Sequence, residues 1–215
     1  MHMHRHAYER RQSSSSIAEG APDKLLFVPA AITNVIGFDD APFAHRHRGD
    51  VRIFGVICAR TRLDGVVSGW VRRDGANATG RMIELVDGSQ FRRHVRAVLL
   101  QGIAVAGFNV VDVHRLAERL AVPVVVVSRR KPRLLRMKAA RFGHTRGAAR
   151  KWRLIEQAGE MEPLGNVWVQ RVGIDRDETA ALLRATTLHG HLPEPLRLAH
   201  LIAGGVTTGK SRGRA

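Results

Sequence analysis

Cysteine, acidic residues and long apolar runs are all scarce in this 215-residue chain. The single cysteine, Cys58, excludes an internal disulfide and fits a reducing compartment. No apolar run approaches the roughly 18 residues of a membrane-spanning helix, and the polar N-terminus lacks the apolar core of a signal peptide. We therefore expect a cytoplasmic protein with no membrane partner.

The shortage of acidic residues leaves a large positive charge. The chain has 35 Lys and Arg against 19 Asp and Glu, a formal net charge of +16. Residues 129–153 hold eleven basic residues and no acid. Such one-sided charge repels itself unless a polyanion neutralises it, so nucleic acid is the expected partner and an anionic membrane surface the lesser candidate. The residues expected to contact phosphates are Arg129, Arg130, Lys131, Arg133, Arg136 and Lys138.

The most informative stretch is residues 34–40, which reads NVIGFDD. Its apolar residues suit a buried strand that stops at two adjacent carboxylates, Asp39 and Asp40. A buried carboxylate is costly unless a cation or a hydrogen-bond donor meets it. Two interpretations stay open: a cation site, or a polar turn over residues 39–42 in which an Asp side chain bonds its own backbone.

Periodicity predicts an α/β domain over residues 25–204, between a disordered tail at 1–24 and a basic C-terminal tail at 205–215. Strands are expected at 32–38, 51–59, 65–72, 95–101, 123–127 and 167–172, and helices at 77–86, 109–121, 133–142, 145–157, 176–187 and 195–203. Asp64-Gly65 predicts the hairpin turn before the third strand, and Asn109 is expected to cap a helix. The run at 123–127 suits a strand buried on both faces, which favours a parallel sheet covered by helices.

Other motifs have competing explanations. Residues 204–211 match the phosphate-loop spelling G-x-x-x-x-G-K-S, but they follow a predicted helix rather than a strand, so we expect no nucleotide hydrolysis. Asp74 ends the third strand, and the glycine-punctuated residues 102–109 after the fourth strand fit a close-packed turn under a site. His200 suits either a lone core histidine or a site residue.

Five segments carry a resemblance to a known family: residues 36–40 (IGFDD), 74–79 (DGANAT), 101–112 (QGIAVAGFNVVD), 123–127 (PVVVV) and 193–200 (PEPLRLAH). They look like the domain-of-unknown-function family numbered 99, which is similar to endonuclease V and is linked to cleavage at deaminated bases, including deoxyuridine. The resemblance implies a ribonuclease H-like fold: a mixed sheet with helices on both faces, in which the ends of the first and fourth strands lie side by side.

The resemblance also implies roles for single residues. Asp39 matches the first-strand aspartate that binds the metal in endonuclease V, Asp74 matches the glutamate of that enzyme's Phe-Arg-Glu stretch, and His200 takes the place of another site residue. Two departures stand out. Gln101 replaces the fourth-strand aspartate, and the wedge motif with proline and tyrosine is absent, so the resemblance does not extend to recognition of hypoxanthine.

Together these features predict a DNA-repair endonuclease that depends on Mg²⁺ or Mn²⁺ and cuts DNA near a deaminated base, with RNA as an alternative partner. Asp39, Asp74 and His200 are the expected catalytic residues. The metal is expected at Asp39, with Asp40, Asp74 and Gln101 completing or supporting its coordination, because oxygen ligands suit these cations. The alternative is a nucleic-acid-binding protein whose nuclease site has decayed, which the missing fourth-strand acid supports.

Overall fold

The computed structural model describes residues 32–131 and 147–211. The tail expected at 1–24 and the helix expected at 133–142 lie outside these residues, as do Arg133, Arg136 and Lys138. All described residues belong to one unit of the chain, which begins at Ala31.

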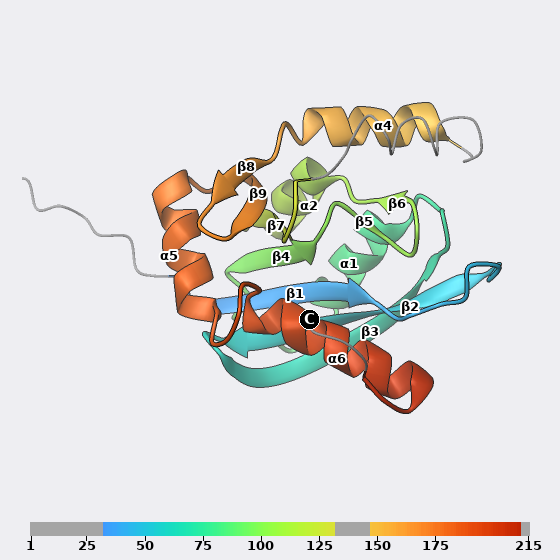
Figure 1. Ribbon diagram of the computed structural model, residues 1–215, viewed down its shortest axis with the longest axis horizontal. Helices are drawn as coiled ribbons and strands as arrows, with labels where there is room; N and C mark the ends of the chain where they lie inside the picture. Colours follow the sequence, from blue (N-terminus) through green and yellow to red (C-terminus); the bar gives the residue numbers. More distant parts are fainter. Residues whose placement is uncertain (1–31, 132–146, 212–215) are drawn as a thin grey trace, which may run out of the picture. The chain divides into compact units, whose positions relative to one another are not determined.

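A mixed sheet with the strand order β3-β2-β1-β4-β7-β9-β8 forms the centre of the structure (Figure 1). β1 runs antiparallel to β2 and parallel to β4, β4 runs parallel to β7, and β9 is antiparallel to β7. The strands are β1 (Asn34–Asp40), β2 (Asp50–Ala59), β3 (Arg62–Arg72), β4 (Ala97–Gln101), β7 (Val124–Ser128), β8 (Glu162–Leu164) and β9 (Val167–Val172). The strands β5 (Ala104–Val105) and β6 (Asn109–Val110) pair separately.

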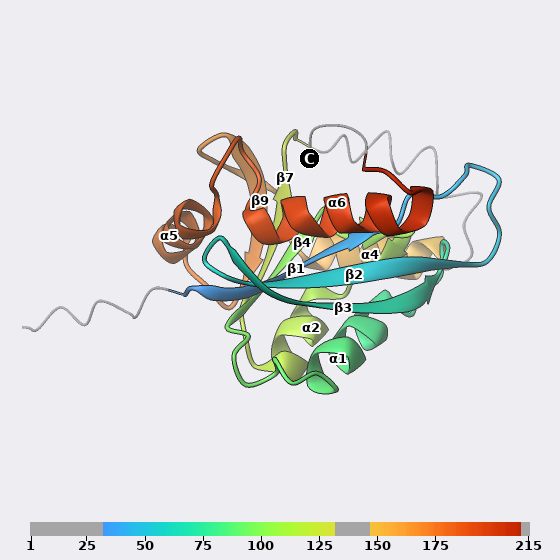
Figure 2. The same ribbon diagram turned by 90° about the horizontal axis from the view of Figure 1, so that it is seen from below.

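Helices cover both faces of the sheet because alternate residues of each strand point to opposite sides. Ile36 and Phe38 of β1 pack in a core shared with α1 (Ala78–Asp87) and α2 (Val113–Leu120). Val35 packs in a second core with residues of α5 (Arg176–Thr186) and α6 (Glu194–Thr208). Figure 2 shows α6 on one side of the sheet and α1 and α2 on the other. The expectation of a mixed sheet with helices on both faces is confirmed.

The hairpin turn between β2 and β3 is not where the sequence pattern placed it. Ala59 pairs with Arg62, so the turn residues are Arg60 and Thr61, and Arg60 adopts a φ of 56°. Gly65 instead lies within β3, where a Cβ atom would come within 2.1 Å of the Phe91 ring. The glycine of the Asp-Gly pair therefore permits close packing rather than a turn.

Other boundaries moved by a few residues. β1 ends at Asp40 rather than at residue 38, so both acids belong to the strand itself. α4 (Ala148–Gln157) matches the helix expected at 145–157, whereas α6 continues to Thr208, beyond the expected end at 203. The two-residue strands β5 and β6 and the three-residue β8 are too short to produce a recognisable alternation in the sequence.

Close approach between β1 and α6 occurs at Gly37. A Cβ atom at this position would lie 2.6 Å from the backbone carbon of Pro195 and 2.8 Å from the nitrogen of Leu196. Backbone atoms cannot move aside as a flexible side chain can, so Gly37 sets how closely α6 lies on the sheet.

Gly37→Ala is expected to lower the free energy of unfolding by about 1–3 kcal/mol, because it overpacks this contact. Gly205→Ala in α6, the helix that packs against Gly37, is the control, since a Cβ atom at position 205 meets nothing within 4 Å. The control should leave stability unchanged or raise it by about 0.5–1 kcal/mol. Urea unfolding curves of both variants would test this, and equal stabilities would contradict it.

Candidate functional site

The carboxyl ends of β1, β4 and β7 meet at one edge of the sheet. Phe38 of β1 pairs with Leu100 of β4, so Asp39 and Gln101 follow as neighbours one residue further along. Both lie on the face covered by α6, because they alternate with Phe38 and Leu100, which point to the opposite core. Ligands of open α/β sheets gather at this kind of edge.

α6 contributes His200 to this edge. Nδ1 of His200 lies 2.8 Å from Oδ2 of Asp39, across 161 positions of sequence. The His200 side chain is 39% exposed and that of Asp39 is 13% exposed. Oδ1 of Asp39 also accepts the backbone N–H of Asp40 at 3.0 Å, although both residues belong to β1 and not to a turn. His200 is therefore no core histidine, and the Asp39 carboxylate is held at both oxygens.

Gln101 has a buried oxygen without a partner. Its Oε1 atom is inaccessible to solvent and makes no hydrogen bond within the described residues. A buried acceptor left unpaired costs about 1–3 kcal/mol, so such an atom at a functional edge calls for a donor or a cation. A carboxamide oxygen beside a carboxylate suits a hard divalent cation, so the residues present fit Mg²⁺ or Mn²⁺ in their chemistry.

Asp40 points to the other face of β1 and meets the short β5–β6 hairpin. Its carboxylate accepts a hydrogen bond from the backbone of Ala106. Burial, and then the charge of Asp39, raise the pKa of Asp40 to about 7. Burial also raises the pKa of Asp39, against the opposing hydrogen bond from His200. The two carboxylates thus ionise together only at a cost, which a bound cation would remove.

Asp74 joins the same hairpin from the end of β3. Its backbone N–H donates to the Ala106 carbonyl at 2.9 Å, and its Oδ1 accepts the Phe108 N–H at 2.8 Å. A Cβ atom at Gly107, where φ is +86°, would lie 2.6 Å from Oδ1. Ala106 therefore connects Asp74 to Asp40. Across the two described stretches of the chain, no three acidic, histidine or cysteine side chains converge on a metal position.

Asn109 was predicted to cap a helix, and this was wrong: Asp112 caps α2 and accepts the Arg115 N–H at 3.0 Å. Asn109 is fully buried in β6. Its Nδ2 donates to the Arg72 carbonyl and to Asn77, each at 2.9 Å, and its Oδ1 accepts the Ala78 N–H at 3.1 Å. Sequence reasoning missed this role because the partners lie more than 30 positions away.

Lys151 is a second residue whose role the sequence concealed. It falls in the basic run expected to meet nucleic acid, yet it is only 2% exposed. Its Nζ donates to the Asp74 backbone carbonyl and lies 5.7 Å from the centre of the Phe108 ring. Burial lowers the pKa of Lys151, opposed by the charge of Asp74. Lys151 therefore attaches α4 to the segment after β3 that carries Asp74.

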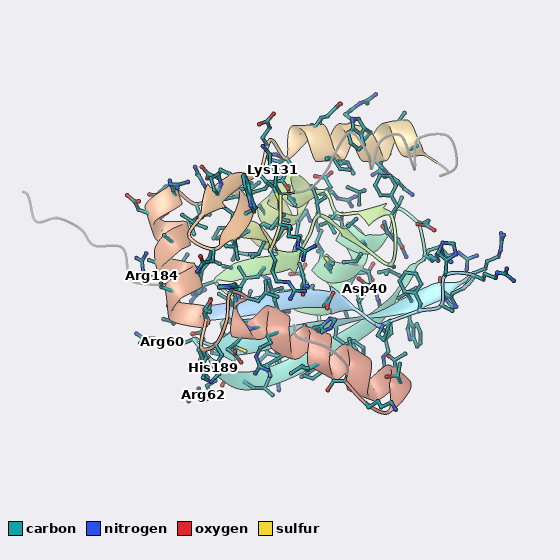
Figure 3. All side chains as sticks on the ribbon, in the orientation of Figure 1. Asp40, Arg60, Arg62, Lys131, Arg184 and His189 are labelled. Atoms are coloured by element: carbon teal, nitrogen blue, oxygen red, sulfur yellow. The ribbon has the colours of Figure 1, made fainter. Side chains whose placement is uncertain are left out.

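The described part of the predicted phosphate-binding group, Arg129 to Lys131, follows β7 at the same edge as Asp39. Lys131 Nζ lies 5.3 Å above the Trp168 ring. In Figure 3, Asp40 lies at the arrowhead end of β1, whereas four exposed basic side chains lie around the opposite end of the sheet: Arg60, Arg62, Arg184 and His189. Within residues 32–131 and 147–211, none of the helices has the length and apolar character that a membrane span requires.

Comparison with solved structures identifies the class of fold to which this chain belongs. A protein of unknown function from Archaeoglobus fulgidus is 30% identical, with a TM-score of 0.75 over 81% of this chain and 98% of that one. Endonuclease V from Bacillus subtilis is 14% identical, with a TM-score of 0.55 over 83% and 82% of the two chains. Endonuclease V from Ciona intestinalis, solved with a 24mer DNA containing an inosine followed by a ribo-adenosine, is 11% identical and has a TM-score of 0.50 over 78% and 82%. The fold is ribonuclease H-like, as predicted.

Sequence comparison then identifies the family. The sequence model of the Endonuclease dU family matches residues 31–207. The UPF0215 protein DR_A0167 of Deinococcus radiodurans is 56% identical over 183 residues, which are 85% of this chain and 93% of the relative. The chain belongs to the Endonuclease dU family, and the resemblance noted in its sequence is confirmed.

Asn109→Ala is expected to destabilise the protein by at least about 2 kcal/mol, because it leaves the Arg72 carbonyl and the Ala78 N–H without their side-chain partner in a buried place. Asp112→Ala is the control, since losing an N-cap costs about 1 kcal/mol. Chemical unfolding would rank the two variants. A smaller loss for Asn109→Ala than for Asp112→Ala would mean that the buried network does not hold the site together.

Proposed function

We propose that this protein is a divalent-metal-dependent endonuclease that acts on DNA near a deaminated base such as deoxyuridine. The observation that carries the proposal is the hydrogen bond between Asp39 and His200 beside the unpaired Gln101 oxygen, at the carboxyl edge of a ribonuclease H-like sheet. Membership of the Endonuclease dU family supports the reaction class and the base. The DNA bound by the Ciona intestinalis endonuclease V supports the partner.

In this proposal Asp39, Asp40 and Gln101 hold the cation through oxygen atoms. A divalent cation bound there would polarise a phosphoryl oxygen and lower the pKa of an attacking water. Asp40 reaches the edge from the opposite face of β1, where the Ala106 N–H orients its carboxylate. The backbone N–H of Asp74 donates to the Ala106 carbonyl, so the proposed contribution of Asp74 is to position Ala106 and, through it, Asp40.

His200 is the proposed proton carrier. Asp39 fixes the ring through Nδ1, which leaves Nε2 to take a proton from, or give one to, a reacting oxygen. The partial exposure of the ring gives a substrate access to it. Arg129, Arg130 and Lys131 leave β7 two strands away and would bind the phosphate backbone on that side.

A second candidate function has its own support. Gln101 contributes no negative charge, and no cluster of three charged or thiol ligands occurs in the described residues. A nucleic-acid-binding protein that has lost cleavage would show the same arrangement. The two candidates differ in their response to metal, because the nuclease needs the cation to act whereas the binding protein associates equally well in EDTA.

Asp39→Asn tests the nuclease directly. The amide keeps the volume but loses the charge, so cleavage of oligonucleotides with a single uracil or hypoxanthine should fall at least about 100-fold with Mg²⁺ or Mn²⁺, while binding in EDTA persists. Asp50→Asn is the control, because Asp50 is an exposed acid at the start of β2. Unchanged cutting by Asp39→Asn would remove Asp39 from the mechanism, and binding without any cutting by the native protein would favour the second candidate.

Gln101→Asp tests the metal separately from activity. The added carboxylate should lower thermal stability without metal near neutral pH, because it faces Asp39. It should also tighten Mg²⁺ binding by about 1–3 kcal/mol, so the melting temperature should climb more steeply with Mg²⁺ than that of the native protein. Gln101→Leu is the matched control, since it removes the oxygen and adds no charge. Identical slopes for the three proteins would show that position 101 does not face a cation.

A further inference from the structure

The face of β3 beside the site carries an exposed aromatic side chain. Gly69 and Val71 face α1, so Ser68 and Trp70 point to the same side of the sheet as α6. α6 packs mainly on β1 and β2, and β3 is the outermost strand on that side of the sheet, next to β2 (Figure 2). Trp70 is consequently 54% exposed.

Arg52 holds this surface in a defined shape. Its guanidinium carbon lies 5.6 Å from the centre of the Trp70 ring and 5.2 Å from that of Phe54. Nη2 donates to Ser68 Oγ at 3.0 Å, whereas the buried Nε has no hydrogen-bond partner and no carboxylate of the described residues pairs with the group. The result is an exposed indole ring that carries the guanidinium of Arg52, with no carboxylate partner in the described part of the chain, over one of its faces.

The strand register places this surface near the site. Asp39 pairs with Phe54, which pairs with Ser68, and Trp70 pairs with Arg52. Trp70 therefore lies two strands across and two residues along from Asp39, on the same face. At about 4.8 Å per strand and about 3.3 Å per residue, the two Cα atoms are about 12 Å apart, the rise of roughly three to four stacked nucleotides.

We propose that Trp70, flanked by Arg52, stacks an unpaired nucleobase of the strand that enters the Asp39 site. This rests on the proposed function and adds the form of nucleic acid that the site accepts. The bases of a duplex are already stacked on one another, so an exposed indole can receive only a base in a single strand or one extruded from a duplex. Every base has a π-face, so the contact suits an enzyme that meets varied flanking sequence, and the positive charge of Arg52 complements the phosphates.

The test is the affinity of the full chain in EDTA for single-stranded oligothymidylate and for a duplex without unpaired bases, measured by fluorescence anisotropy. Trp70→Ala should weaken single-strand binding roughly 5- to 150-fold, the range for losing one stacked base, and should change duplex binding little. Trp70→Phe should retain most of the affinity, because a ring remains. Leu63→Ala, another exposed apolar side chain of β3, is the control and should behave as the native protein.

The outcomes separate this inference from the proposed function. An unchanged single-strand affinity in Trp70→Ala, or an equal loss for both nucleic acids, would overturn the stacking surface even if the native protein cuts normally. A loss in Leu63→Ala as large as in Trp70→Ala would overturn it too, because it would reveal a general apolar contact. If the native protein bound neither nucleic acid, the proposed function would fail together with the inference.

Discussion

The burial of two adjacent carboxylates at the end of β1 is the constraint on which the rest of this structure depends. Asp39 and Asp40 lie on opposite faces of one strand, and burial raises the pKa of each. Each needs a partner from a distant segment, so α6 supplies His200 on one face and the β5–β6 hairpin supplies Ala106 on the other. The glycine contact at Gly37 brings α6 close enough for the first of these bonds.

Buried polar side chains near the β5–β6 hairpin connect segments of the chain through hydrogen bonds, which apolar side chains cannot make. Asn109 connects the end of β3 to the start of α1, and Lys151 ties α4 to the Asp74 carbonyl. Buried amides and ammonium groups are costly unless their hydrogen bonds are made, so such residues specify one arrangement of the elements they connect. The Asp40 side of the site is therefore positioned by a polar framework, and the Asp39 side by helix packing.

Charge is distributed unequally around this edge. The site has carboxylates but replaces a third acid by the neutral Gln101, so a cation there would meet less negative charge than in a site with an acid on each strand. Basic residues follow β7 at the same edge, and Arg52 with Trp70 lies on the same face of the sheet. A polyanion crossing this face would meet cations on both sides of the acidic centre, which suits phosphodiester chemistry.

The sequence by itself determined the order of the longer strands and of the described helices, the family, and the position of Asp39 at the end of a buried strand, because hydrophobic periodicity and short motifs are local properties of the chain. Only the tertiary structure decided that Asn109 is a buried connector rather than a cap, that Lys151 of the basic run points inward, and that Arg60 and Thr61 form the hairpin turn. It also excluded the core interpretation of His200, whose side chain is 39% exposed and whose partner, Asp39, lies 161 positions away. Local patterns report burial, whereas the identity of a buried group's partner depends on which distant segments the fold brings together.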